Sequence, residues 1–469
     1  MISYTKLSYG NANGSYDKGV INQISDNAAS PTIDLAVVDA LPFDPQNPLP
    51  LGGDPRVLGF TDGSGNERAL VVNYNYSGWD PGTAEFGIFD PSTTPWTSVA
   101  VRTNTQWSKL TNPYGIARLD NANMFVADYD GGLIDKITLT NYAEVLTGGN
   151  AFYTFPVVSG NTAYCAGIGV YDGKIVALFN QGQGYSSYIA STLAIINPSD
   201  GSAVYLGPTS NNPNAAGLGQ NALGLTVDGG YAYVSSYGGP QQGGGNTTSR
   251  LEAVNLSTLT ITGTHTAGSD SRGDFTSVAV NGADAYVLRA SYTASYDQYN
   301  YNIYKTTTAI LQSNAPIISP PFINNASEPP NASDESYPGV TWLLAYANGR
   351  LWAVLGDRIA GIDPSTPPTI DWQRVAYYDT STTPATANTL GNYGQGTTTK
   401  DTDHINTAAV VQTNVPAPTV TRGVTRGAPA APSYSVSNRG AQHPAFISRT
   451  PEALKLRKKL IEDWKKNKK

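Results

Sequence analysis

Oxygen-bearing side chains that could serve catalysis or metal binding occur at the ends of several predicted strands. Metal-assisted hydrolysis would need several converging oxygen ligands, including carboxylates, around a hard divalent cation. Asp128 and Asn180 are the candidates that the sequence places at such ends. His265, His404 and His443 are widely spaced, match no metal-ligand pattern and fall at no such end, which disfavours histidine acid–base chemistry. We therefore predict no catalytic residue and treat Asp128 and Asn180 as minor metal candidates.

Two short segments resemble fragments of calcium-binding loops. Residues 128–132 and 62–67 place oxygen-bearing side chains at alternate positions. Neither segment has the complete ligand set or the distal bidentate glutamate of an EF-hand loop. Because Asp, Asn and Gly are also the ordinary residues of tight turns, we interpret both segments as turns. The expected cofactor is none, with Ca²⁺ as the minor alternative.

The elements that would carry these side chains are expected to be strands joined by turns. The 469 residues include 48 glycines, 31 prolines and 29 tyrosines, and only 14% are charged, against about 25% in typical soluble proteins. This composition excludes a coiled coil or a helical bundle, and no apolar run approaches the roughly 18 residues that span a bilayer. The single cysteine, Cys165, allows neither an intrachain disulfide nor a thiolate metal site, and we expect it to be buried and inert.

Composition also bears on the compartment and on the partners. Abundant Ser, Thr, Asn, Gly and Tyr with scarce Cys is typical of a bacterial surface or exported protein. We expect an extracellular or cell-surface location, with the periplasm as the alternative, although the sequence contains no signal peptide. Residues 404–469 carry a net charge of +9 and the preceding residues a net charge of −16. A body this acidic should repel nucleic acid and anionic lipid, so an anionic partner would bind the tail.

Self-similarity is the strongest signal in the sequence. Six segments share an apolar-Gly-apolar step that opens a predicted strand, although the last two replace the glycine. The steps are centred on Gly59, Gly115, Gly167, Gly224, Ser277 and Trp342, at intervals of 56, 52, 57, 53 and 65 residues. Each step is followed by a second segment of alternating or continuous apolar residues between Gly, Asn and Asp clusters, which is a strand pattern rather than a helix pattern.

Each repeat unit then has a third strand that ends in Asp or Asn, usually before Pro-Ser. This turn occurs at Asp90, Asn197 and Asp363, with Asn255 as a variant. Asp and Asn cap such turns and proline presets the following φ, so the segment suits a hairpin between third and fourth strands. Four strands per unit at a period above about forty residues predict an all-β fold of the β-propeller type.

Several of these segments carry a family resemblance. The sequences VDGGYAYVSSYGG followed by SRLEAVNLSTLTI, and VYDGKIVALF followed by STLAIINPSDGSAVYLG, resemble the YVTN and NHL-like β-propeller superfamily over about residues 31–379. The resemblance implies the fold. It leaves the activity open, because that superfamily includes surface proteins, lactonases and a streptogramin lyase.

The six units leave a ring to be closed. Residues 32–51 resemble outer strands without inner partners, and the alternating segment that begins at His404 lies where a seventh opening strand is due. Because open sheet edges invite aggregation, we predict a seven-bladed propeller over residues 1–413 that is closed by N- and C-terminal strands, with six or eight blades as alternatives. Residues near 404–413 should then pair with a strand from the first fifty residues.

The C-terminal segment differs from the repeats. Residues 414–449 are rich in Pro, Ala and Thr and predict a linker. Residues 450–469 predict a basic amphipathic helix, with Thr450 as its cap and Pro451 at its first position. This helix is expected to bind either an anionic partner or the acidic propeller itself.

Ligands of such propellers usually bind at the face where opening strands begin and second strands end. Alignment of the second strands places aromatic and polar side chains on this rim, namely Tyr74, Tyr76, Trp79, Asp128, Tyr129, Asp130, Tyr185, Tyr237, Arg289 and Tyr292. Tyr and Trp combine a flat apolar face with a hydrogen-bonding group, which suits sugar rings or a protein surface.

We therefore predict a noncatalytic, extracytoplasmic binding, adhesion or scaffold propeller that recognises a carbohydrate polymer or a surface protein through this rim. One alternative is a lactonase-like, metal-dependent hydrolase that uses the central channel. The other is a structural surface-layer component.

Overall fold

The computed structural model describes residues 2–4, 9–10, 15–16, 21–25, 32–42, 48–51, 56–74, 84–183, 188–238, 249–267, 274–292, 299–317, 323–325, 342–347, 350–355, 358–363, 369–379, 386–389 and 408–409. Strands dominate these ranges, as the sequence predicts, and the helix found in them, α1 (Thr308–Leu311), has four residues. No helix in the described ranges is long and apolar enough to cross a bilayer. The predicted linker and C-terminal helix lie outside the described residues, so the domain limits remain predictions.

The described strands form seven antiparallel sheets of four or five strands and two short hairpins. The first sheet contains, in order, β34 (Ala408–Ala409), β1 (Ile2–Tyr4), β4 (Ile21–Ser25) and β5 (Thr32–Val38). The second contains β8 (Arg56–Thr61), β9 (Glu67–Tyr74), β10 (Ala84–Asp90) and β11 (Thr97–Thr103). The third contains β12 (Pro113–Arg118), β13 (Asn123–Asp128), β14 (Leu133–Thr138) and β15 (Tyr153–Thr154). The hairpins are β2 (Tyr9–Gly10) with β3 (Ser15–Tyr16), and β6 (Ala40–Leu41) with β7 (Leu49–Pro50).

The remaining sheets repeat the pattern. The fourth contains β16 (Thr162–Tyr171), β17 (Lys174–Gly182), β18 (Ala190–Ile196) and β19 (Ala203–Leu206), with β20 (Leu218–Gln220) also paired to β18. The fifth contains β21 (Ala222–Asp228), β22 (Tyr231–Ser236), β23 (Arg250–Asn255) and β24 (Thr260–Thr266). The sixth contains β25 (Asp274–Asn281), β26 (Asp284–Tyr292), β27 (Tyr299–Thr307) and β28 (Ile323–Asn325). The seventh contains β29 (Trp342–Ala347), β30 (Arg350–Leu355), β31 (Arg358–Asp363), β32 (Thr369–Asp379) and β33 (Thr386–Thr389).

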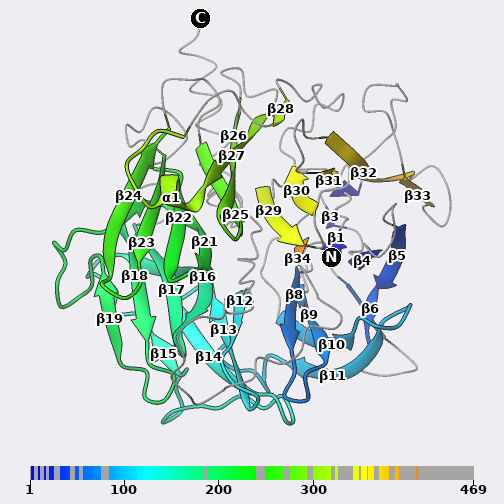
Figure 1. The fold of residues 1–469 in the computed structure, drawn as a ribbon. Coiled ribbons are helices and arrows are strands. Elements are labelled where there is room, and N and C mark those ends of the chain that lie inside the picture. The colour runs from blue at the N-terminus through cyan, green and yellow to red at the C-terminus, as the bar shows by residue number, and fades with distance from the viewer. Residues whose placement is uncertain are drawn as a thin grey trace, which may run out of the picture.

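The opening strands of successive sheets pack against one another. β8 contacts β12, β12 contacts β16, and the series continues through β21 and β25 to β29, while β1 and β34 of the first sheet contact β8. Figure 1 shows the sheets following one another around a common centre, from the blue strands through cyan and green to yellow. Four-stranded antiparallel sheets whose first strands are neighbours in this way are the blades of a β-propeller-type fold. All six repeat steps lie in opening strands, as predicted. Asp90, Asn255 and Asp363 end third strands, and Asn197 directly follows one, which also agrees with the prediction.

The two ends of the described chain meet in the first sheet. Ala409 pairs with Ile2, and Ala408 pairs with Ser3, in an antiparallel register. The pairing expected between residues 404–413 and the first fifty residues is therefore present between β34 and β1. β5 is the outermost strand of this sheet, which agrees with the outer-strand pattern that begins at residue 32. The rest of the predicted outer segment differs, because β6 and β7 form a separate hairpin.

A β-bulge marks the repeat step. In the third to sixth sheets the bulge lies immediately before Gly115, Gly167, Gly224 and Ser277. The glycines allow the next sheet to approach closely: a Cβ added to Gly115 would lie 2.8 Å from Ile168 Cγ2, and one added to Gly167 would lie 2.9 Å from Leu225 Cβ. The step that identifies the repeat in the sequence is therefore the contact between neighbouring sheets.

Serine replaces glycine at this step in the sixth sheet, and the contact changes its chemistry. The Ser277 hydroxyl accepts a hydrogen bond of 3.1 Å from the backbone N–H of Leu344 in the seventh sheet. The fifth and sixth sheets are joined similarly, because the Ser235 hydroxyl donates to the Thr276 carbonyl at 3.1 Å. Apolar side chains fill the remaining space between sheets. For example, Val176 and Leu178 of β17 belong to the same core cluster as Leu225 and Val234 of the fifth sheet.

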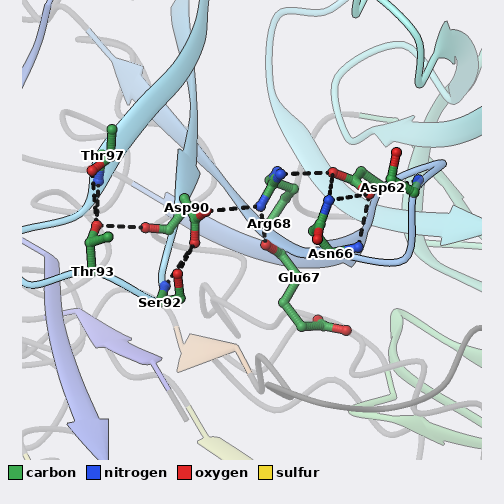
Figure 2. Close-up of polar contacts among 9 residues, drawn as sticks. Asp62, Asn66, Glu67, Arg68, Asp90, Ser92, Thr93 and Thr97 are labelled. Carbon is green, nitrogen blue, oxygen red and sulfur yellow. Dashed lines mark hydrogen bonds and ion pairs between the residues drawn. The ribbon is translucent and has the colours of Figure 1, made fainter.

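A charged network joins two turns of the second sheet (Figure 2). Asp62 accepts hydrogen bonds of 2.9 Å from the backbone N–H groups of Ser64 and Asn66, and its other oxygen lies 2.9 Å from the Arg68 guanidinium. Arg68 also forms a 3.3 Å ion pair with Asp90 at the end of β10. The segment 62–67 is thus a capped turn whose carboxylate is held by an arginine.

A short strap crosses from the sixth sheet to the fifth. It consists of α1 and residues 312–315, which lie between β27 and β28 in the chain, and it covers the outer strand β24. The Asn314 side chain accepts from the Thr264 N–H at 2.9 Å, and His265 Nε2 lies 3.2 Å from the Leu311 carbonyl oxygen. A Cβ on Gly263 would lie 2.1 Å from that same Leu311 oxygen, so only glycine fits there. The strap shields a sheet edge that would otherwise be open.

Candidate ligand-binding rim

The rim that the sequence predicts is formed where second strands end beside the start of opening strands. Pro113 pairs with Asp128 in the third sheet, and Tyr164 pairs with Asn180 in the fourth. Ala222 pairs with Ser236 in the fifth sheet, and Phe275 pairs with Arg289 in the sixth. These pairs place the described rim residues of four consecutive sheets at the same end of their strands.

Asp128 anchors the chain as it enters the third sheet. Its carboxylate is fully buried and accepts hydrogen bonds from the Thr111 N–H at 2.5 Å, the Thr111 hydroxyl at 3.1 Å and the Asn112 N–H at 2.8 Å. Burial raises the pKa of Asp128 to about 7, because the charged form loses its hydration and these three bonds compensate only in part. The hydrogen-bonding capacity of the carboxylate is thus used by the two residues that precede β12.

The neighbouring residues form an aromatic row across two sheets. The Tyr129 ring is buried and lies 5.0 Å from the Tyr114 ring and 5.1 Å from the Tyr164 ring. Asp130 is exposed, and its carboxylate accepts from the Asn112 side-chain amide at 2.9 Å. Tyr129 therefore packs the third sheet against the fourth, and Asp130 is the acid of this segment that faces solvent.

The β-bulge separates Asp128 and Asn180 in register. Asp128 pairs with Pro113 and Phe179 pairs with Cys165, each directly before the bulge of its opening strand. Phe179, rather than Asn180, therefore holds the position that corresponds to Asp128. Because successive side chains of a strand point to opposite faces, Asp128 and Asn180 face different ways relative to their own sheets. Across the described ranges, no three or more His, Cys, Asp or Glu side chains are placed to hold a metal ion.

The junction of the fourth and fifth sheets contains buried amide and hydroxyl groups. Asn180 Oδ1 accepts from the Ser191 hydroxyl at 2.9 Å, and this hydroxyl accepts from the Ala222 N–H at 3.2 Å. Asn180 Nδ2, the Tyr188 hydroxyl and both side-chain polar atoms of Asn221 are buried without a hydrogen-bond partner among the described residues. These three side chains come from β17, from the segment before β18 and from the turn before β21.

The other predicted rim residues vary in how far the structure describes them. Tyr237 is buried, and its N–H donates to the Asn221 carbonyl at 3.2 Å. The buried Arg289 guanidinium lies 5.1 Å from the Phe275 ring and 5.8 Å from the Tyr304 ring. The backbones of Tyr74 and Tyr292 end β9 and β26. The predicted rim residues outside the described ranges are Tyr76, Trp79 and Tyr185.

Sequence reasoning missed Asn112 and Asn221, although a signal was present. Each lies three residues before the glycine of its repeat, Gly115 and Gly224. Asn221 has a φ of 53°, in the left-handed region that asparagine tolerates better than most residues. An alignment of the repeats on their glycines would have shown the shared asparagine immediately before two opening strands.

Comparisons with known proteins give likenesses at low identity. No protein-family model and no curated protein sequence matches the chain. One similar solved structure is a putative 6-phosphogluconolactonase from Bacteroides uniformis, with 14% identity, 77% of this chain and 91% of that chain covered, and a TM-score of 0.43. A second is a quinoprotein alcohol dehydrogenase-like protein from Bacteroides thetaiotaomicron, with 12% identity, 77% of this chain and 85% of that chain covered, and a TM-score of 0.37. A third is the β-propeller domain of the Trilobed protease from Pyrococcus furiosus, with 9% identity, 84% of this chain and 100% of that chain covered, and a TM-score of 0.35. Since all three TM-scores are below 0.5, the fold rests on the strand order and packing described above.

Proposed function

We propose that this protein is a noncatalytic binding propeller whose rim recognises a neutral, hydroxyl-rich polymer such as a carbohydrate. The proposal includes a ring of seven blades that the first and last strands close, within the YVTN and NHL-like superfamily. A carbohydrate is preferred to a surface protein because the unpaired rim groups are amides and a hydroxyl, which exchange hydrogen bonds with sugar hydroxyls in both directions.

The carrying observation is the set of unpaired polar atoms on Asn180, Tyr188 and Asn221. Buried polar groups are nearly always hydrogen-bonded, so such atoms imply a partner that is either ordered water or a ligand group. Tyr164 and Tyr237 lie at the same rim, where both are buried in the core that packs these sheets together. Water-bridged contacts to a sugar would use the amides without exposing them, since bridging waters are nearly as favourable as direct bonds.

The described chemistry supports binding over the lactonase-like alternative. The Asp128 carboxylate already accepts three hydrogen bonds from the protein, and the bulge turns Asn180 to the other face. A hydrolase of that type would need carboxylates that converge on one point.

The proposed location is extracytoplasmic, and it rests on composition. The low charge content and the abundance of Ser, Thr, Asn, Gly and Tyr support a surface or exported protein. We further propose that the basic residues 450–469 hold the protein to an anionic partner, which the opposite charges of tail and body support.

The test is a binding panel of neutral and acidic polysaccharides with the full-length protein and its Asn221→Gly variant. Glycine keeps the left-handed backbone and removes the amide, so a neutral polysaccharide should bind roughly three- to tenfold more weakly, as expected for one lost hydrogen bond. The matched control is Asn197→Gly, which removes an asparagine at the opposite end of the fourth sheet. Equal affinities in all three proteins, or no binding to any polysaccharide, would reject the proposal. Lactone hydrolysis that needs a divalent cation and is lost in Asp128→Asn would establish the hydrolase instead.

A further inference from the structure

Asp135 is a buried acid of the third sheet. It lies in β14, pairs across the strand ladder with Val126, and is 0% exposed. Neither of its carboxylate oxygens has a hydrogen-bond partner among the described residues. An ionised carboxylate in such a site would have lost its hydration with little compensation, which is strongly unfavourable. The site therefore favours a neutral, protonated Asp135.

Glu144 lies beside Asp135 and is in the opposite situation. The Glu144 carboxylate accepts a 2.9 Å bond from the Ser108 hydroxyl and a 2.8 Å bond from the Lys109 N–H. These two bonds fix the Glu144 carboxylate against the connection that precedes β12. Glu144 pairs with Ile137, two residues along β14 from Asp135, and this places its carboxylate within hydrogen-bonding reach of the Asp135 carboxyl. Two ionised carboxylates have no proton to share, so the contact becomes a hydrogen bond only when Asp135 carries one.

Other charged groups near the pair do not change this assignment. Burial and the adjacent Glu144 raise the pKa of Asp135 to about 8, and the charge of Asp128 adds to the shift. The nearby backbone N–H of Lys136 acts in the opposite direction. The Lys136 ammonium is directed elsewhere, since it lies 5.7 Å from the Phe125 ring and 5.8 Å from the Phe152 ring.

Glu144 also holds the chain between the second and third sheets. Ser108 and Lys109 belong to the connection from β11 to β12, and Trp107 in the same connection donates its indole N–H to the Tyr142 carbonyl at 2.8 Å. The connection ends at Thr111 and Asn112, which bond to Asp128. Movement of Glu144 would therefore disturb the segment that enters the rim.

We propose that Asp135 and Glu144 share one proton and act as a pH-sensitive latch between the second and third sheets. With the proton present, Asp135 donates to Glu144, and Glu144 fixes residues 108 and 109. When the proton leaves to solvent, two like charges face each other in a buried site and the latch loosens. The latch is independent of the polysaccharide-binding proposal.

The direction of the pH effect follows from the raised pKa. The folded chain keeps a proton that the unfolded chain loses near pH 3.9, so stability falls as pH rises from about 4 to about 8 and then levels off. One such proton changes the unfolding equilibrium by at most about tenfold per pH unit. Asp128 titrates in the same range, so the latch must be measured as a difference between the wild type and a variant.

The experiment is urea unfolding of the full-length wild type and of Asp135→Asn from pH 5 to pH 9. The asparagine amide donates to Glu144 at every pH, so the variant should gain stability over the wild type steadily between pH 6 and pH 8, by up to about tenfold per unit in the unfolding equilibrium. Asp200→Asn, which alters an exposed turn acid, is the control and should follow the wild type. A wild-type–variant difference that does not change with pH would overturn the latch.

A second measurement tests the latch without the Asp135→Asn variant, in case that variant does not fold. Hydrogen exchange at the Lys109 amide should accelerate above pH 8 in the wild type beyond the intrinsic tenfold per pH unit, because its acceptor moves. In Glu144→Gln, a neutral amide that donates to Asp135 removes the repulsion, and the excess acceleration should disappear. Equal excess in both proteins would count against the latch.

Discussion

Gly115 and Ile168 touch across the boundary between the third and fourth sheets, so that a Cβ on Gly115 would lie 2.8 Å from Ile168 Cγ2. Gly115→Ala should therefore destabilise the protein by about 1–3 kcal/mol, the usual cost of overpacking a core. Urea unfolding measures this change.

Ile168→Ala supplies the matched partner for that test. As a single variant it removes Cγ2 and should lower the free energy of unfolding by about 2–5 kcal/mol. In the double variant the new Cβ enters the space that Cγ2 left, so the two losses should sum to more than the measured loss. Strict additivity would show that the contact is not what makes glycine necessary.

Ser277 should be replaceable by glycine more easily than by alanine. Ser277→Ala leaves the buried Leu344 N–H without its acceptor, at a cost of about 1–3 kcal/mol, and adds no room for water. Ser277→Gly restores the residue found at this step in four other repeats and opens space where water can bond that N–H. Thermal unfolding compares the two, with Ser257→Ala in an exposed turn as the control. An alanine variant as stable as the wild type would contradict the assigned bond.

Arg68 should matter far more than an exposed cation. The side chains of Asp62 and Arg68 are only 9% and 12% exposed. Arg68→Met therefore leaves the buried Asp62 carboxylate without its counter-charge and should lower the free energy of unfolding by about 3 kcal/mol. Lys305→Met breaks the 3.2 Å pair with Asp284, whose members are far more exposed, and should cost less than about 1 kcal/mol. Denaturant midpoints give both values. Equal losses would refute the assignment of Arg68 to a buried network.

The Arg68 effect should also depend on pH in the acid range. Burial opposes ionisation of Asp90, but the hydrogen bonds from Ser92 and the Arg68 charge outweigh it and hold its pKa below the ordinary value. The stabilisation by this pair is therefore present above about pH 4 and is lost as pH falls further. The stability gap between wild type and Arg68→Met should narrow below pH 4, as unfolding midpoints from pH 2.5 to pH 7 would reveal. A gap that stays constant with pH would argue against the ion pair.

Removal of the basic tail should reduce the retention of the protein on an anionic polymer without changing its stability. Deletion of residues 417–469 takes away linker and predicted helix, so the melting temperature should stay nearly unchanged while retention on an anionic polymer falls. Retention of the full chain should weaken at high salt, because exposed charges attract over only about 8 Å at physiological ionic strength. A melting temperature lowered by many degrees with unchanged retention would make the tail part of the fold.

The sequence predicts the sheets well because the repeat step and the Asp or Asn turns are local signals. Both are confirmed, since Gly115 lies in an opening strand and Asp90 ends a third strand. The details of the rim depend on a bulge, which no local pattern revealed, and a one-residue shift was enough to put Phe179 where Asn180 was expected. Tyr129 illustrates the same limit: tyrosine suits both exposed and buried aromatic contacts, and only the neighbouring sheet decides between them. The role of Asp135 could not be predicted, because Glu144 reaches it through the fold.

The strap over β24 sets where this chain can be divided. Its residues belong by connectivity to the sixth sheet and by contact to the fifth, so a cut between residues 267 and 274 would take the cover from one unit and leave the other with a loose segment. The two repeats therefore form a single cooperative block, and native-state unfolding should release them together. Whole-repeat duplication, deletion or exchange at this boundary would have to move the strap together with the strand it covers.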